Sequence, residues 1–234
     1  MTKLGIIGAM EIEVAILKSK LENAKVTKVG PMEFYEGRLA GLDVVIVMCG
    51  VGKVHAAMCT QVLCAMFGVT HIVNTGVAGS LDAQLDICDV LVSTDAIQHD
   101  MDVTHLGYDV GKVPGLDVQA FPADEKLVRY AYDASEALRP GHTRLGRVAT
   151  GDQFVNSKAL KEKIIADTAA QCTEMEGGAI AQVAYVNRVP FVILRAISDK
   201  ADDSADMDYP TFEKLAAHNC AAVTEALAKR LAEE

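Results

Sequence analysis

Acidic side chains stand where apolar runs of this sequence end. Asp199 closely follows the run 191–197, in which Arg195 is the only charged residue. A carboxyl group at the end of a buried strand is partly desolvated, which favours its protonated form and predicts a general acid. Glu13 follows the first apolar run, at 4–8. A carboxylate there would repel an anion and is suited to activating a water molecule.

Glu174 and Glu176 flank Met175, just ahead of a predicted helix at 177–186. Side chains two residues apart project in different directions on a strand and on a helix. We therefore expect only one of these two carboxylates to enter a pocket. A helix N-cap or a surface charge is the structural alternative for each acid, and it suits Glu174 better than Asp199.

Three of the predicted strand ends are followed by glycine-rich segments, at 8–13, 50–53 and 75–80. Glycine allows the backbone to approach a ligand closely, although glycines are also common in ordinary strand–helix turns. The segment at 50–53 fits neither an NAD site nor an ATP site, because His55 replaces the third glycine of the dinucleotide pattern and Val54 follows Lys53. No cofactor is predicted.

No arginine lies in these three segments, although an inorganic phosphate pocket favours the forked donors of arginine. Lys53 is the exception to consider, because lysine also binds phosphate. Water is therefore the expected nucleophile. The cluster from His99 to His105 would be split between two faces of a strand, so a solvated loop is expected there and no metal site.

Apolar runs alternate with helical patterns along the chain, which predicts an α/β fold: a mixed, largely parallel twisted sheet with helices on both faces. Ligands of such folds bind outside the carboxyl ends of the strands. Strands are expected at 4–8, 34–39, 42–49, 71–74, 89–93, 95–99, 145–149 and 191–197. Helices are expected at 11–21, 54–67, 124–138, 157–166 and 177–186, with a last helix that begins near Pro210.

The composition limits the possible partners and location. A chain of 234 residues with 50% hydrophobic residues fits one domain, 1–234. The net charge of −10 argues against nucleic-acid binding, and no apolar run is long enough to span a bilayer. The six cysteines form no C-x-x-C pair and no signal peptide is evident, which predicts a cytoplasmic protein with reduced thiols.

Taken together, seven segments resemble the bacterial 5′-methylthioadenosine/S-adenosylhomocysteine nucleosidases of the nucleoside phosphorylase superfamily, over the whole chain. Any one of them is weak evidence, but their order and spacing are specific. They are GIIGAMEIEV (5–14), GVGKV (50–54), NTGVAG (74–79), HDMDVTHLGY (99–108), TGDQFV (150–155), EMEGGAIA (174–181) and RAISD (195–199).

The resemblance implies an N-glycosyl hydrolase that releases adenine from these nucleosides, in methionine salvage and recycling of S-adenosylmethionine by-products. It implies that Glu13 is the general base on water, Asp199 the acid at purine N7, and Glu176 the carboxylate on the ribose hydroxyls. The other implied substrate-binding residues are Met10, Val51, Ala78, Gly79, Phe154, Val155, Met175, Arg195, Ser198 and Tyr209. Among these, Arg195 is expected near the water, Phe154 against the purine ring, and Met10, Val51 and Tyr209 around the 5′-thio group.

The same resemblance implies a homodimer in which each subunit contributes to the neighbour's site. The residues so implied are Val103, Leu106, Tyr108 and Pro114. Val77, Leu106 and Tyr209 depart from the family pattern, where Ser, Phe and Phe are common. These differences leave open the preference among methylthioadenosine, adenosylhomocysteine, 5′-deoxyadenosine and 6-amino-6-deoxyfutalosine.

Three other functions fit the sequence less well. A purine nucleoside phosphorylase would use phosphate in place of water, which Glu13 and the arginine-free segments disfavour. A non-catalytic nucleoside-binding protein would be expected to lack one of the three carboxylates. A Rossmann oxidoreductase lacks support because the glycine fingerprint is incomplete.

Overall fold

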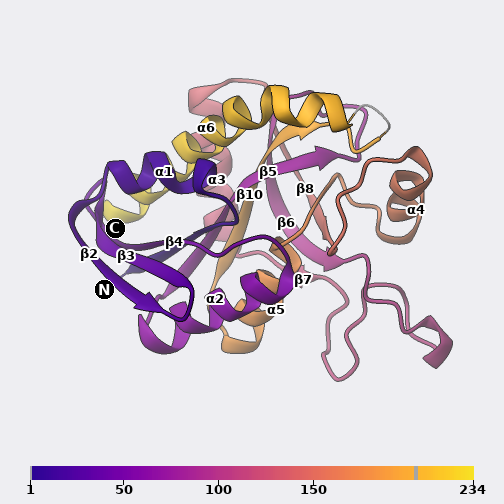
Figure 1. Cartoon of the computed structure of the whole chain (residues 1–234), viewed down its shortest axis with the longest axis horizontal. Helices are drawn as coiled ribbons and strands as arrows, with labels where there is room; N and C mark the ends of the chain where they lie inside the picture. Colours follow the sequence, from indigo (N-terminus) through magenta and orange to yellow (C-terminus); the bar gives the residue numbers. More distant parts are fainter. Residues whose placement is uncertain (1, 203–204) are drawn as a thin grey trace.

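The computed structural model describes residues 2–202 and 205–234, with side chains except at 206–208. Strands and helices alternate along much of this part of the chain (Figure 1). The strands are β1 (Lys3–Gly8), β2 (Glu22–Val29), β3 (Met32–Leu39), β4 (Leu42–Met48), β5 (His71–Ser80), β6 (Val90–Gln98), β7 (Phe121–Pro122), β8 (Thr143–Thr150), β9 (Cys172–Glu174) and β10 (Phe191–Asp199). The helices are α1 (Glu11–Ser19), α2 (Lys53–Met66), the 3₁₀ turn η1 (Thr104–Leu106), α3 (Glu125–Leu138), α4 (Lys158–Thr168), α5 (Gly177–Asn187) and α6 (Ala205–Ala232).

The described strands form one ten-stranded mixed sheet in the order β10-β6-β8-β9-β5-β1-β4-β3-β2, with β7 on β6. Parallel ladders join β4, β1, β5 and β10, and join β6, β8 and β9. Because β10 pairs with both β5 and β6, and β9 with both β5 and β8, these five strands close into a ring of pairings. The carboxyl ends of β1, β5 and β10 therefore meet beside β9.

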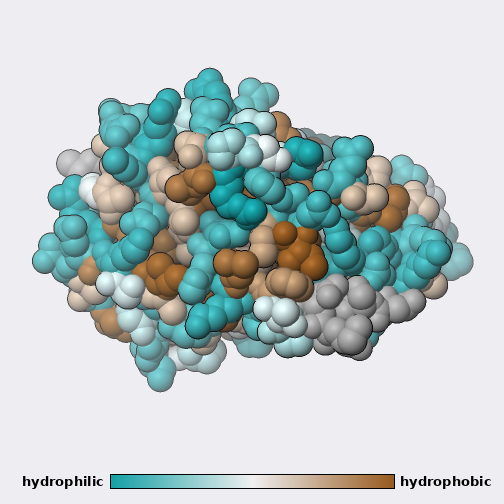
Figure 2. All heavy atoms as spheres, turned by 90° about the horizontal axis from the view of Figure 1, so that it is seen from above, coloured by the Kyte–Doolittle hydropathy of each residue, from teal (hydrophilic) through white to brown (hydrophobic). Residues whose placement is uncertain are grey.

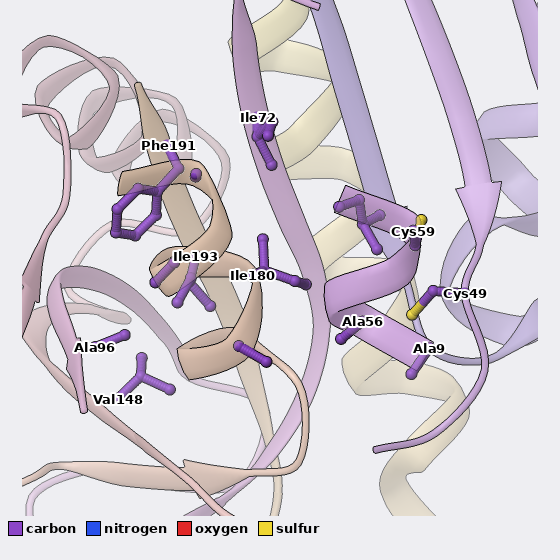
Figure 3. Packing of buried hydrophobic residues seen from close by; sticks show 14 of the residues in the cluster. Ala9, Cys49, Ala56, Cys59, Ile72, Ala96, Val148, Ile180, Phe191 and Ile193 are labelled. Atoms are coloured by element: carbon purple, nitrogen blue, oxygen red, sulfur yellow. The ribbon is translucent and has the colours of Figure 1, made fainter. Parts of the chain in front are cut away.

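Helices cover both faces of the sheet, as predicted (Figure 1). Helices α1, α3 and α6 lie on one face and α2 and α5 on the other, each over its own buried apolar cluster. Figure 3 shows the cluster between the sheet and helices α2 and α5. In it, Ala56 of α2 and Ile180 of α5 pack toward Ile72 and Ile193 of the sheet. These four side chains are completely buried, so burial of apolar surface holds this layer together.

Most predicted elements are confirmed within a few residues, including the hairpin β3–β4 and the helices α1 to α5. The two strands expected at 89–93 and 95–99 are one strand, β6, whose register against β8 shifts between Ser93 and Asp95. Helix α6 begins at Ala205, five residues before Pro210. Strand β2 was not predicted, because its exposed, charged sequence lacks an apolar face and its only ladder is to β3.

The prediction that the strand beginning at His71 ends at Asn74, with residues 75–80 following it, is wrong. These residues continue β5 to Ser80, because β10 pairs alongside them and β9 pairs with Gly79 and Ser80. Ser198 and Asp199 likewise belong to β10 and do not follow it. The glycines read as a turn signal are strand residues whose missing side chains leave room for charged groups of the neighbouring strand.

None of the described helices combines the length and the apolar character that a membrane span requires. The face above α1 and α6 is mainly hydrophilic, with separate hydrophobic patches (Figure 2). All six cysteines are unpaired; five are buried and Cys64 is half-buried. They pack as small apolar side chains, as the sequence predicts.

Candidate active site

A cavity of about 210 Å³ opens at the carboxyl ends of β1, β5 and β10. This is where an α/β sheet is expected to hold its ligand. Segments that are far apart in the sequence contribute to its wall. The lining residues are Ala9, Met10, Glu13, Val51, Val77, Ala78, Gly79, Gln153, Phe154, Val155, Thr173, Glu174, Met175, Glu176, Ser198, Asp199 and Tyr209.

Glu13 is held rigidly at the start of α1, with 2% of its surface exposed. Its Oε2 accepts the backbone N–H groups of Ala9 (2.7 Å) and Met10 (3.0 Å), and its Oε1 accepts that of Val77 (3.0 Å). Burial raises the pKa of the Glu13 carboxyl, while Arg195 and these N–H groups oppose the rise. Three of the roughly four lone pairs of this carboxylate are occupied, which leaves one on Oε1 for a water molecule.

Arg195 is 1% exposed and lies behind the cavity rather than in its wall. Its Nη2 donates to Glu174 and to Asn74 Oδ1 (2.5 Å). The same nitrogen is 3.8 Å from Oε2 of Glu176, and Nη1 is 4.0 Å from Oε1 of Glu13. Burial acts to lower the pKa of Arg195, but Glu174, Glu13 and Glu176 together raise it, so the group stays charged.

The expectation that only one of Glu174 and Glu176 enters a pocket is wrong, because both line the cavity. The chain changes direction between them: Glu174 ends β9 and Glu176 is the N-cap of α5, so neither the strand nor the helix period applies. Glu174 also has the capping role suggested for it. Its Oε2 accepts the N–H groups of Glu176 (3.0 Å) and Gly177 (2.7 Å), and its Oε1 accepts the Thr150 hydroxyl.

Glu176 is 4% exposed and its carboxylate reaches across the cavity to the turn before α2. Oε1 accepts the backbone N–H of Gly52 at 2.8 Å. Burial and the nearby charge of Glu174 raise the pKa of Glu176 to about 7, against the effects of Arg195 and the Gly52 N–H. The second oxygen remains beside the cavity and can accept hydrogen bonds from the hydroxyl groups of a ligand.

Asp199 ends β10 in the wall of the cavity and is 2% exposed, which confirms the predicted burial. The hydroxyl of Ser198 donates to Oδ2 (2.8 Å), and the N–H of Ala201 donates to Oδ1 (2.8 Å). The backbone of Gly79 faces this carboxyl, since an added Cβ there would lie 2.7 Å from Oδ1. Glycine is therefore required where β5 passes Asp199.

The mouth of the cavity is apolar and aromatic. The rings of Phe154 and Tyr209 meet edge to face, with centroids 5.6 Å apart. The Tyr209 hydroxyl lies 3.3 Å from Sδ of Met10 and 2.9 Å from Oε1 of Glu213, to which it donates. Phe154 is 44% exposed and Val51 is 50% exposed, so this side of the cavity is open to solvent.

Positive charge is kept out of the cavity. Among the residues that the structure describes, no Lys, Arg or His lines it. The ammonium group of Lys53, considered above as a phosphate ligand, is 2.6 Å from Oδ1 of Asp100. The guanidinium of Arg195 is bound to Glu174 and Asn74. The cavity therefore presents carboxylates and no free cation, which suits a neutral ligand and a water molecule better than an inorganic anion.

Of the site residues predicted for this subunit, all except Arg195 line the cavity. Val103, Leu106, Tyr108 and Pro114, predicted to serve a neighbouring subunit, do not line it; they lie on the segment between β6 and β7, which extends away from the sheet (Figure 1). Leu106 is 73% exposed. Within the described residues, no group of His, Cys, Asp and Glu side chains has the arrangement of a metal site.

The polar residues Gln153 and Thr173 line the cavity and were not predicted, and neither was the pairing of Asn74 and Glu174 with Arg195. Asn74 is completely buried and binds Arg195, and Glu174, for which a cap or surface charge is the favoured alternative from the sequence, binds Arg195 as well. A polar residue at the end of the apolar run 71–74 was the available signal for Asn74. Nothing in the local sequence indicates that Glu174 pairs with Arg195, because the contact depends on how β9 and β10 are placed.

Known proteins resemble the chain along almost its whole length. The profile of the Phosphorylase superfamily matches residues 3–229. A 5′-methylthioadenosine/S-adenosylhomocysteine nucleosidase from Psychromonas ingrahamii is 40% identical over 231 residues, which cover 98% of this chain and 99% of that protein.

Two solved structures extend the comparison to the fold. The 5′-methylthioadenosine/S-adenosylhomocysteine nucleosidase of Neisseria meningitidis, in complex with methylthio-immucillin-A, has a TM-score of 0.95 and 37% identity, covering 98% of this chain and 100% of that one. The futalosine hydrolase of Helicobacter pylori has a TM-score of 0.93 and 31% identity, covering 98% of both chains. With the same fold and about 40% identity over nearly the whole chain, this chain belongs to the 5′-methylthioadenosine/S-adenosylhomocysteine nucleosidase family of the Phosphorylase superfamily.

Proposed function

We propose that this protein hydrolyses the N-glycosidic bond of 5′-methylthioadenosine and S-adenosylhomocysteine, releasing adenine and the 5-thioribose, as a step of methionine salvage. One observation carries the proposal: Glu13, Glu176 and Asp199 converge on a single cavity whose described lining has no cationic side chain. Cleavage of a glycosidic bond needs a protonated leaving group, a positioned water and negative charge near the sugar. The three carboxyl groups can supply these three requirements.

Glu13 is assigned as the general base. The three N–H donors fix its carboxylate and leave one lone pair of Oε1 for the water proton. Its raised pKa makes the carboxylate a better proton acceptor than an exposed glutamate. Arg195, 4.0 Å away, stabilises the ionised form before the proton is taken.

Asp199 is assigned as the general acid that protonates N7 of the purine. Ser198 and the N–H of Ala201 hold the carboxyl in one orientation. Protonation of the base removes the negative charge that would otherwise develop on the leaving adenine. The bond from C1′ to the base then breaks with both electrons going to the purine.

Glu176 is assigned to the ribose hydroxyls. Its ionised carboxylate accepts hydrogen bonds from these hydroxyls and places negative charge near the oxocarbenium-like sugar. Met175 lies in the same wall and is assigned to the underside of the sugar. Phe154 is assigned to stacking on the purine, with the Val155 backbone on its edge and Ala78 and Gly79 around it. Met10, Val51 and Tyr209 are assigned to the 5′-thio group.

Release of adenine from 5′-methylthioadenosine, measured with and without inorganic phosphate, tests the proposed function. We expect the same rate in both conditions and a free reducing sugar as the second product. A phosphate requirement together with a sugar 1-phosphate would instead identify a phosphorylase. Adenosylhomocysteine, 5′-deoxyadenosine and 6-amino-6-deoxyfutalosine, assayed alongside, would rank the substrates.

We also propose that the active form is a homodimer. Val54, Met58 and Met66 of α2 and Val186 of α5 are exposed apolar side chains on two helices that pack together. An exposed apolar face of this kind is typical of an interface. Leu106 and Tyr108 project from the segment between β6 and β7, and in a dimer they can cover the open mouth of the neighbour's cavity.

Sedimentation velocity of Met58→Glu tests the dimer, with Leu138→Glu on α3 as a matched exposed control. We expect the α2 variant to become monomeric and to lose activity, and the α3 variant to behave like the wild type. A dimeric Met58→Glu variant would refute this choice of interface.

The protein is proposed to be cytoplasmic. The six free cysteines support this location, because thiols stay reduced in the cytoplasm, and cell fractionation would test it.

A further inference from the structure

The carboxylate of Asp100, just beyond the end of β6, joins two other segments. Its Oδ1 is 2.6 Å from Nζ of Lys53, in the first turn of α2. Its Oδ2 accepts the backbone N–H of Asp152, which follows β8, at 3.0 Å. The carboxylate of Asp152 in turn accepts the backbone N–H of Lys53 at 2.8 Å. These three residues, called here the Lys53–Asp100–Asp152 bridge, form a closed set of contacts.

The bridge lies outside the cavity, yet the segments it joins form part of the cavity wall. The residue before Lys53 is Gly52, whose N–H donates to Oε1 of Glu176 at 2.8 Å. The residues after Asp152 include Phe154 and Val155, which line the cavity. The bridge therefore connects the group assigned to the ribose with the groups assigned to the purine.

The local backbone is built to allow these contacts. Gly52 has a φ of +96°, a left-handed conformation that favours glycine. An added Cβ would lie 3.0 Å from Oδ1 of Asp152, so a side chain at Gly52 would crowd the carboxylate that binds Lys53. The glycine thus permits both the turn and the approach of Asp152.

The ion pair between Lys53 and Asp100 is partly shielded from solvent, so it can hold the two segments in a fixed position. The side chains of Lys53 and Asp100 are 20% and 23% exposed, so salt and water screen their attraction less than on an open surface. Burial acts to raise the pKa of Asp100, but Lys53 and the Asp152 N–H outweigh it and hold the pKa below its usual value. The Asp100 carboxylate is therefore ionised at neutral pH, where the proposed reaction would run.

We propose that Asp100 is a positioning residue for nucleoside binding: through Lys53 and Asp152 it holds the Gly52 N–H on Glu176 and sets the distance from that carboxylate to Phe154 and Val155. This inference rests on the proposed function, because it takes Glu176 as the ribose ligand and Phe154 as the purine platform. It gives roles to Lys53 and to Asp100 of the cluster from His99 to His105, which the assigned chemistry does not use. The bridge acts on binding, because neither Asp100 nor Lys53 reaches the cavity.

Asp100→Asn and Lys53→Met test the proposal, because each removes one charge of the pair at nearly constant size. For 5′-methylthioadenosine we expect KM to rise about tenfold, with a much smaller change in kcat, since the substrate grip is loosened and the acid and base stay in place. Lys53→Arg should recover most of the affinity. The double variant should be no worse than either single variant, because both changes remove the same contact.

Asp95→Asn is the matched control. Asp95 pairs with Arg147 at 2.7 Å, joins β6 to β8 as well, and is 23% exposed, as is Asp100. A merely structural role predicts similar KM values for the two Asp→Asn variants. Equal KM values in these variants, or a fall in kcat at unchanged KM, would overturn the proposal.

Adenine affinity, measured by calorimetry, provides a readout that does not require turnover. We expect Asp100→Asn to weaken adenine binding relative to the wild type and Asp95→Asn to leave it unchanged, and equal affinities in all three would count against the bridge. The wild-type assay of adenine release tests the proposed function separately. If the wild type hydrolyses the nucleoside and Asp100→Asn has the same KM and adenine affinity as the wild type, only the positioning role is refuted.

Discussion

Nη1 of Arg195 lies 4.0 Å from Oε1 of Glu13, and neither side chain is more than 2% exposed. The single positive charge of Arg195 also faces Glu174 and Glu176. One cation cannot compensate three buried carboxylates, because each loses its hydration on burial. Burial accordingly raises the pKa values of Glu13 and Glu176 even with Arg195 beside them. Glu13 and Glu176 therefore bind a proton more readily than exposed glutamates do.

Asp199→Asn is expected to keep ligand binding and to lose most of the turnover. Asparagine has nearly the same size, its oxygen can still accept the Ala201 N–H, and its NH2 group can donate to the Ser198 hydroxyl oxygen, but it has no carboxyl proton to give to the purine. Loss of general acid catalysis typically lowers the rate by about 10²–10⁴-fold. Single-turnover kinetics together with calorimetry of adenine measure the two effects. Turnover at the wild-type rate would remove Asp199 from the mechanism.

Glu13→Gln should lower kcat by a similar factor of about 10²–10⁴, because the amide cannot take a proton from water. Glu11→Gln is a suitable control, since Glu11 stands in the same first turn of α1 but its side chain is 59% exposed and pairs with Lys18. We expect the control to keep the wild-type rate. An active Glu13→Gln enzyme would show that the water is activated elsewhere.

The activity should depend on the ionisation of Glu176. Its pKa of about 7 means that the carboxylate is protonated in acid and ionised above neutrality. Because the ionised form accepts hydrogen bonds from the ribose hydroxyls and carries the negative charge that stabilises the sugar, kcat/KM should rise with pH and level off above about pH 7. The raised pKa of Glu13 acts in the same direction.

Comparing the pH profile of kcat/KM with that of Glu176→Gln separates the two groups. The variant has no group that ionises at this position. We therefore expect the fall of its kcat/KM at low pH to follow the pKa of Glu13 instead of that of Glu176. An acidic limb at the same pH in both enzymes would assign it to Glu13 or another group and not to Glu176.

Gly76→Ala is expected to destabilise the fold as well as the site. A Cβ there would lie 2.1 Å from Nη1 of Arg195 and 2.4 Å from Oε1 of Glu13, so two buried charged groups would have to move. We expect a loss of several kcal/mol in the free energy of unfolding, at the upper end of single substitutions.

Gly5→Ala in β1 is the control for this substitution, because its Cβ would meet only apolar side chains, those of Leu63 at 3.2 Å and Val69 at 3.4 Å. Denaturant unfolding of the two variants measures the difference. Equal stability of the two alanine variants would show that Arg195 and Glu13 can relax without cost.

Much of the layout follows from local patterns. Apolar runs such as 42–49 and 191–197 predict buried strands, because only a covered sheet hides such segments from water. The helical spacing around Val14 and Leu17 likewise predicts α1, and both side chains are completely buried. Patterns fail where pairing rather than burial determines the structure, as in β2 and in the glycine-rich half of β5.

The sequence by itself determined the class of fold and the carboxyl groups available for chemistry, because apolar periodicity and residue type are local properties. Only the tertiary structure decided which acidic and basic side chains pair with each other. Arg195 binds Asn74 and Glu174 and stays out of the cavity, and Lys53 binds Asp100. Such contacts depend on the register of β5 against β10 and on the distances between strand ends, which no local pattern encodes. The electrostatic character of the cavity, acidic and without a free cation in its described lining, follows from that packing.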